Sequence, residues 1–428
     1  MDLEKLRILG TLLFICFAIP TWGQKSKIDS LNQLAYEGYR EDVATSKAWA
    51  YQALSIAKQH QLNPQKVDSY INLSRCFRTE GNWDSAYQVL NIAIVLAEKN
   101  RYSKGLINAH NNLAACYLIQ GEVQSAEPHF KKSLSYAREI DDAKGQANAY
   151  NNLAIIAESN FAYDSAMSYL HGALEVYRQI SDSSGITRTY VNQAFIFELQ
   201  NLSDSAIYYC IKALRIQEAL QLSYQQANTH IQIGNLYDDQ KDYANALKQF
   251  QRSLALFEQI GDIGGLCSAN LNIGSALESL ARADEALPYL RKGLQYARKT
   301  DDPFLIGTSL INLSNIYGSL KRNPDTIKSI LNESIPLLSG KETVSAAYSA
   351  LGILALDDGR FNVAQQWFEK ELQTAEEFDN LQSIKTALEH LYLVYKEKNQ
   401  AAEALAFFER FTALEDSIFN LESVETIN

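Results

Sequence analysis

Apolar residues recur three and four positions apart in segments of roughly fifteen residues, which is the spacing of an amphipathic helix. Residues 109–119 and 126–137 are two such segments, and Gly121-Glu122-Val123 separates them. A short break between two amphipathic segments allows the chain to reverse direction and pack the two apolar faces together. The pattern therefore predicts a helical hairpin as the local unit.

The hairpin repeats along the chain with a period of forty residues. Six alanines mark this period, namely Ala86, Ala126, Ala166, Ala206, Ala246 and Ala286. Other equivalent positions of the successive repeats, here called columns, show the same period. A Leu or Ile lies thirteen residues before most of these alanines, and a small residue directly follows it. Small residues at these positions let two helices approach closely, and aromatic side chains of one hairpin are expected to fill the space left by the small residues of the next. This repetition predicts an all-α solenoid of stacked hairpins.

The limits of the array follow from the same columns. The last two units are anchored on Ala364 and Ala404, and a degenerate first unit covers residues 34–57. Near residues 323–338 Thr326 takes the alanine position, and the following positions fit only after a one-residue shift. We expect a local change of curvature there. The array is predicted to span residues 24–417 in about ten units, followed by a tail over residues 418–428.

The first residues have the layout of a signal peptide. Lys5 and Arg7 precede an apolar run over residues 8–20, which is shorter than the ~20 residues of a membrane span. The pattern predicts a signal peptide over residues 1–23 and a mature start near Gln24. Two alternatives stay open: an uncleaved segment that anchors the protein in the inner membrane, and a lipoprotein modified at Cys16.

Charge and composition exclude several function classes. The net charge of -11 and the lack of a basic stripe argue against nucleic acid as a partner. No spacing of His, Cys or Asp suggests a metal site, and no glycine-rich phosphate loop is present, so neither an enzyme nor a cofactor is expected. His110 and His230 share a column with tyrosines, which favours packing. Four cysteines are expected as buried hydrophobes rather than disulfides, namely Cys76, Cys116, Cys210 and Cys267.

The unit resembles the tetratricopeptide repeat. The resemblance rests on Leu113-Ala114-x2-Tyr117-x3-Gly121-x4-Ala126-x3-Phe130-x2-Ser133 and covers nearly the whole chain after residue 23. It implies a right-handed superhelix whose inner groove is lined by the first helix of each hairpin. The forty-residue unit is similar to those of kinesin light chains, bacterial peptide-receptor regulators and, most of all, exported Gram-negative sensor proteins. That last likeness, supported by residues 414–420, implies a periplasmic location and a possible membrane signalling partner.

A column of side-chain amides marks the groove that the resemblance implies. The sixth groove-helix position carries an amide in seven consecutive units, namely Asn72, Asn112, Asn152, Asn192, Gln232, Asn272 and Asn312. Further candidates on the same helices are Asn108, Asn148, Asn235 and Arg188, together with Arg75 and Arg78. Asn is a poor helix former, so its repeated placement within helices calls for a compensating contact. Either the amides bind the backbone of an extended peptide, or they bond neighbouring helices and fix the repeat geometry.

These observations predict a non-catalytic scaffold, exported from the cytoplasm, that holds an extended peptide or protein segment in its groove without a small-molecule cofactor. Because neutral hydrogen bonds contribute roughly 1 kcal/mol each and association has its own cost, we expect micromolar, sequence-tolerant binding. Two alternatives remain: a sensory module of a membrane-linked regulatory system that has lost its output domain, and an adaptor in envelope assembly.

Overall fold

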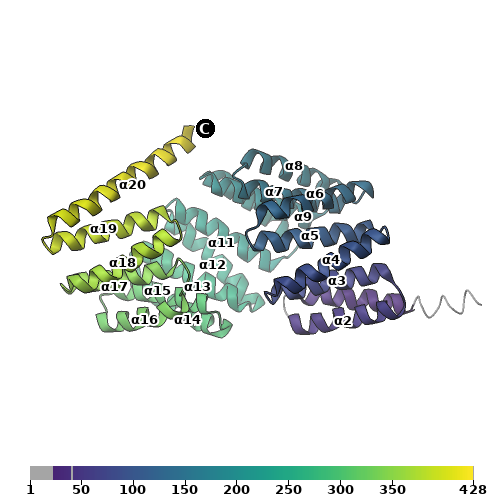
Figure 1. The fold of residues 1–428 in the computed structure, drawn as a ribbon. Helices are drawn as coiled ribbons and strands as arrows, with labels where there is room; N and C mark the ends of the chain where they lie inside the picture. The colour runs from purple at the N-terminus through teal and green to yellow at the C-terminus, as the bar shows by residue number, and fades with distance from the viewer. Residues whose placement is uncertain (1–22, 40–41, 428) are drawn as a thin grey trace, which may run out of the picture. The chain divides into compact units, whose positions relative to one another are not determined.

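The computed structural model of the chain describes residues 23–39 and 42–427, with side chains up to residue 418, and every regular element within them is a helix (Figure 1). The predicted signal peptide lies outside the described residues except for Gly23. A helix over residues 23–38 comes first. The later helices are α2 (Val43–Gln59), α3 (Asn63–Thr79), α4 (Trp83–Lys99), α5 (Ser103–Ile119), α6 (Val123–Glu139), α7 (Ala143–Ser159), α8 (Tyr163–Gln179), α9 (Ser183–Leu199), α10 (Ser203–Ala219), α11 (Ser223–Asp239), α12 (Tyr243–Ile260), α13 (Ile263–Ser279), α14 (Ala283–Thr300), α15 (Pro303–Ser319), α16 (Pro324–Leu337), α17 (Val344–Asp357), α18 (Phe361–Glu377), α19 (Leu381–Glu397) and α20 (Ala401–Ile427).

These helices pair into ten consecutive hairpins within the described part of the chain, which confirms the predicted all-α repeat fold. The backbone divides into two compact units, one ending at Ile216 and one beginning at Gln217, and the division falls within α10. α20 continues through residue 417, so the helix has no break at the predicted start of the tail.

The turns share one backbone conformation. From Gln61 to Lys321 a residue with positive φ occurs every twenty positions, both within and between hairpins, and only three of these residues are glycine. The following residue is often Asp or Asn, whose side chain caps the next helix. Asp182, for example, accepts from the Gly185 N–H at 2.9 Å. Several acidic residues of the turns are therefore helix caps.

The column of alanines forms the centre of each hairpin. All six are completely buried, and bulky side chains of the partner helix pack beside the small-residue column. At Gly234 an added Cβ would lie 2.4 Å from the Phe250 ring, so only a residue without a side chain fits there. The four cysteines after residue 23 are free and buried, as expected.

The second helix of the eighth hairpin, α16, and the first helix of the ninth, α17, depart from the other helices in the region where the sequence predicts a shift. α16 and α17 have 14 residues each, against 17 in most other helices. Thr326 is exposed, and its neighbour Ile327 is 5% exposed and fills the core position instead. The one-residue shift is therefore confirmed, and the turn between α16 and α17 is longer than the standard three residues.

The first helix of each hairpin lies on the inner side of its unit. In unit 1, α3 contacts α5 and α7 contacts α9; in unit 2, α11, α13, α15, α17 and α19 contact one another in turn. No two second helices in the described part of the chain make comparable contact. Closer spacing of the first helices places the predicted amide column on this inner side. None of the described helices is long and apolar enough to span a membrane.

Candidate binding surface on the first helices

Two amides of the predicted column are used inside the protein. The Asn72 amide donates to the Asn32 carbonyl oxygen at 2.8 Å, and its side-chain oxygen accepts from Arg75 at 2.6 Å. The Asn112 amide donates to the Asn108 carbonyl oxygen of its own helix at 2.8 Å. Asn72 is 4% exposed and Asn112 is 9% exposed. Asn72 therefore matches the structural alternative, in which an amide bonds a neighbouring helix, whereas the Asn112 amide is bonded within α5 and joins no second helix.

The next two amides of unit 1 are differently placed. Asn152 and Asn192 are half-buried. The Asn192 amide lies 3.4 Å from the Asn151 side-chain oxygen, which is a weak contact, and Asn152 makes no side-chain hydrogen bond to any described residue. Both carboxamides keep donor and acceptor capacity for a ligand.

The amides of unit 2 lie on α11, α13 and α15. Gln232, Asn272 and Asn312 are partly exposed, and Asn235 is exposed. Within the described residues, the side chains of Asn272, Asn312 and Asn235 have no hydrogen-bond partner. These three also retain their bonding capacity, but no described pocket adjoins them.

Arg188 and Asn148 form one network with a buried tyrosine. The Arg188 guanidinium donates to the Asn148 side-chain oxygen and to the Tyr177 hydroxyl, both at 2.5 Å. The Tyr177 hydroxyl donates to the same Asn148 oxygen at 2.7 Å. Tyr177 is completely buried, and an added Cβ at Gly185 would lie 2.2 Å from its ring. The network joins α7, α8 and α9, so these two predicted groove residues already have partners.

A polar pocket of about 460 Å³ lies between the helix over residues 23–38, α3 and α5, and the predicted residues Asn72, Arg75 and Asn108 line it. Arg75 lies 4.9 Å from the centre of the Tyr36 ring, and burial lowers the pKa of its guanidinium. Burial also raises the pKa of Asp68 to about 6, although the Tyr102 hydroxyl donates to its carboxylate at 3.2 Å. Arg75 and Asp68 form no ion pair with any described residue.

A second pocket, of about 230 Å³, lies between α7 and α9. Its lining is mostly apolar and includes Ile155 and Phe195, which are 38% and 42% exposed. Leu170 of α8 is completely buried beneath them. Glu158 and Asn192 supply the polar groups. Burial raises the pKa of Glu158, whose carboxylate has no hydrogen bond or ion pair to any described residue.

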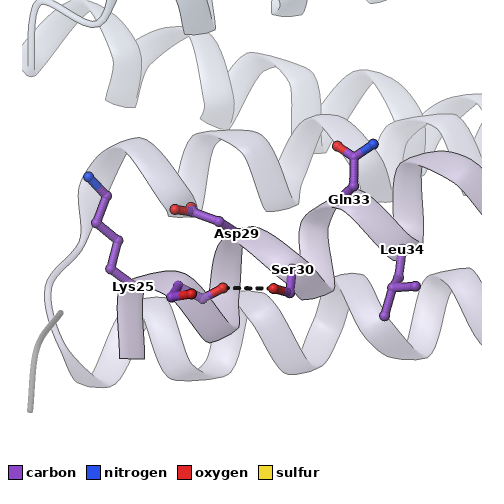
Figure 2. Close-up of a pocket in the computed structure, with 6 residues that line it drawn as sticks. Lys25, Asp29, Ser30, Gln33 and Leu34 are labelled. Atoms are coloured by element: carbon purple, nitrogen blue, oxygen red, sulfur yellow. Dashed lines mark hydrogen bonds between the residues drawn. The ribbon is translucent and has the colours of Figure 1, made fainter. Parts of the chain in front are cut away.

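Another hollow, of about 690 Å³, has no polar groups that face one another. Figure 2 shows that all of its lining residues belong to the helix over residues 23–38. The hydrogen bond drawn there joins the Ser30 hydroxyl to the Ser26 carbonyl oxygen at 3.0 Å, within the same helix (Figure 2). A hollow lined by one helix places no groups opposite one another, so it is a weaker candidate.

The histidines pack as their column predicts. His110 is 2% exposed, and its Nδ1 lies 2.9 Å from Nδ1 of His129. His230 is 6% exposed and bonds to Gln249 at 2.8 Å. No group of three or more His, Cys, Asp or Glu residues among the described positions could hold a metal ion.

The pattern of amides and arginines along the first helices does not predict the apolar pocket, whose walls are mostly aliphatic and aromatic. Ile155 and Phe195 occupy the ninth groove position of successive units, and Glu158 occupies the twelfth. Large apolar residues at positions expected to face solvent were the available signal. The sequence alone does not indicate that Asp68 and Lys104 line the polar pocket, because isolated charged residues on a helix are usually solvated.

Comparisons with known proteins concern the repeat and the fold. A family model described as tetratricopeptide repeat matches residues 105–179 and 185–259, and another with the same description matches residues 268–300. No curated protein matches the sequence significantly.

Solved structures of similar fold extend over most of the chain. RapI in its apo form is 13% identical with a TM-score of 0.62, covering 83% of this chain and 98% of RapI. The apo quorum sensor NprR from B. thuringiensis is 16% identical with a TM-score of 0.54, covering 82% and 98%. A Rap protein complexed with Competence and Sporulation Factor is 14% identical with a TM-score of 0.51, covering 83% and 99%. At these identities the likeness concerns the fold.

Proposed function

Because the chain is a tetratricopeptide-repeat protein, we propose that it is a non-catalytic scaffold that binds an extended segment of another protein on the first helices of unit 1. The observation that carries the proposal is the pair of half-buried carboxamides at Asn152 and Asn192, neither of which has a strong hydrogen bond to a described residue. Asn192 lines the apolar pocket, and Asn152 lies three residues before Ile155 of that pocket. An extended backbone offers an N–H and a C=O at each residue, and a carboxamide can bond to both.

Proteins of similar fold give this proposal indirect support. One Rap structure is a complex with Competence and Sporulation Factor, and NprR is described as a quorum sensor. Both are proteins that recognise another molecule, which is consistent with a binding role for a stack of hairpins. The small number of open amides favours weak, micromolar binding.

A peptide array probed with the purified protein tests this function. Changing Asn152 and Asn192 together to Ala is expected to abolish capture of the array peptides without lowering the helical content or the free energy of unfolding, which the better helix propensity of Ala should raise by up to about 1.4 kcal/mol. Asn72→Ala is the matched control, because that amide is bonded inside the protein and its loss should lower stability instead. Capture that survives the double change, together with lower stability, would refute the ligand role.

We also propose, from the leader pattern of residues 1–23, that the protein acts outside the cytoplasm. Residues 23–38, which directly follow most of the predicted leader, are helical, and Ile28 and Ala35 among them are completely buried. Cleavage before Gln24 would therefore leave the first hairpin almost intact. Mass spectrometry of the amino terminus after expression in a Gram-negative host, combined with periplasmic fractionation, tests this location. An intact Met1 in the soluble cytoplasmic fraction would contradict it.

A further inference from the structure

We propose that the pocket between α7 and α9 selects a bulky apolar side chain that is followed by lysine or arginine in the bound segment. The inference rests on the proposed function and adds the chemical class of the ligand. It is carried by three features of one place: the size of the pocket, its apolar walls and a partner-free carboxylate at its edge.

The size of the pocket fits one side chain. Its volume of about 230 Å³ is below the 300–1,000 Å³ of typical small-molecule sites. Its position on the inner side of unit 1, next to Asn192, places it where a bound backbone would run. A single residue of an extended segment can therefore enter it while the rest of that segment lies along the neighbouring helices.

The walls of the pocket favour an apolar residue. Ile155 and Phe195 occupy the same position on successive first helices, and both leave about two fifths of their surface in water. Ile196 and Leu170 close the base and are 3% and 0% exposed. A bulky aliphatic or aromatic side chain between Ile155 and Phe195 would cover both, and removing apolar surface from water is the main source of binding free energy in such sites.

The edge of the pocket favours a positive charge. Glu158 lies three residues after Ile155 on α7, which places the two side chains on the same face one helical turn apart. Its carboxylate is partly desolvated and has no hydrogen bond or ion pair to a described residue. None of the seven residues that line the pocket carries a positive charge. A lysine or arginine next to the apolar residue would supply the missing counter-charge.

The amides complete the arrangement. Asn152 precedes Ile155 by three residues, and Asn192 precedes Phe195 by three. Each carboxamide therefore lies one turn from an apolar wall and on the same face of its helix. Backbone bonds to the amides would hold the segment, while the pocket and Glu158 would choose its sequence.

Fluorescence anisotropy with three labelled nonapeptides tests the inference. All three are Gly/Ser chains that differ at two central residues: Leu-Lys, Leu-Glu and Ala-Lys. The Leu-Lys peptide is expected to bind at least tenfold more tightly than either of the others. Phe195→Ala should remove the preference for Leu over Ala, and Glu158→Gln should remove the preference for Lys over Glu while keeping that for Leu.

Two control variants separate local effects from general ones. Glu175→Gln removes an exposed carboxylate of α8, and Tyr208→Ala removes an aromatic residue of α10 that is 54% exposed. Both should keep the full preference for Leu-Lys. Circular dichroism of each variant verifies that the helices are retained, which we expect because Glu158 and Phe195 are not core residues.

Equal binding of the three peptides to the unchanged protein would overturn the inference, as would an undiminished preference in both pocket variants. Its failure is distinguishable from failure of the proposed function. Array peptides whose capture requires Asn152 and Asn192 but is unaffected by Phe195→Ala and Glu158→Gln would support the scaffold role and refute the pocket. Absence of any captured peptide would refute both.

Discussion

The buried His110–His129 pair makes the stability of the protein depend on pH. His110 stacks on Tyr136 with 5.9 Å between ring centres, and its Nε2 is buried without a hydrogen-bond partner among the described residues. Burial, and to a smaller degree the charges of His129 and Lys132, lower the pKa of His110 to about 4. The folded protein therefore holds this ring neutral well below the pH at which an exposed histidine gains a proton.

The lower pKa of His110 in the folded protein means that the protein loses stability as the pH falls. The unfolded chain protonates His110 near pH 6.5, whereas the folded chain does so only near pH 4. The stability that the neutral ring provides is fully present above pH 6.5 and is lost as the pH falls towards 4. At roughly 1.4 kcal/mol per pH unit, a change from pH 7.5 to pH 4.5 should remove on the order of 2.5 kcal/mol.

Urea unfolding of the wild-type protein and His110→Phe at both pH values measures this contribution. Phenylalanine keeps a ring for Tyr136 but cannot bind a proton, so the difference in free energy of unfolding should move by about 2.5 kcal/mol in favour of the variant at the lower pH. The change His171→Gln removes an exposed histidine that is not part of the buried pair and serves as the control for loss of a histidine. A difference between wild type and His110→Phe that is the same at both pH values would refute the reasoning.

Three further predictions concern stability and use the same unfolding assay. Gly265→Ala should lower the free energy of unfolding by about 1–3 kcal/mol, because the added Cβ would lie 2.2 Å from the Phe257 ring. Gly172→Ala is the control: its added Cβ would lie 3.7 Å from the nearest atom, so this change should raise the free energy of unfolding by up to about 1 kcal/mol. Lys241→Gly should raise the free energy of unfolding by about 1 kcal/mol, because Lys241 is exposed and has a φ of 60° that glycine adopts without strain. An unchanged free energy of unfolding would show that the turn is not strained. Asn72→Ala should lower stability by about 1–3 kcal/mol, because the buried Asn32 carbonyl loses a donor; a value near zero would return Asn72 to the ligand-binding candidates.

The repeat fold could be predicted because each hairpin repeats the same side-chain volumes at the same core positions. Only a small side chain fits where the two helices of a hairpin approach most closely, as at the completely buried Ala126 and Ala246. The same small residue therefore recurs at the same position of each repeat and is visible in the sequence. The shared backbone conformation of the turns, in contrast, could not be predicted from the sequence. Residues as different as Arg101, Phe161 and Asn201 share a positive φ, because the helices on either side impose the conformation and the side chains face solvent.

The binding surface was only partly predictable, because the role of an amide depends on neighbours that are distant in sequence. Asn72 lies against the Asn32 carbonyl oxygen, forty residues earlier, and is buried by that contact. The Asn192 side-chain nitrogen lies 3.4 Å from the Asn151 side-chain oxygen, which makes at most a weak hydrogen bond. The two residues occupy equivalent positions, so the column alone cannot separate an amide that fixes the repeat from one that stays open to a ligand.

This difference also bears on why the amides are present. Asn in the middle of a helix is less favourable than Ala by roughly 0.7 kcal/mol. At Asn72, hydrogen bonds to Asn32 and Arg75 inside the protein offset that cost. At Asn152 no side-chain hydrogen bond to a described residue does so, and the residue lies three positions before Ile155 and six before Glu158, two residues that line the apolar pocket. In a stack whose stability is a sum over neighbouring hairpins, a local cost without a local benefit is best explained by a partner that binds at that hairpin.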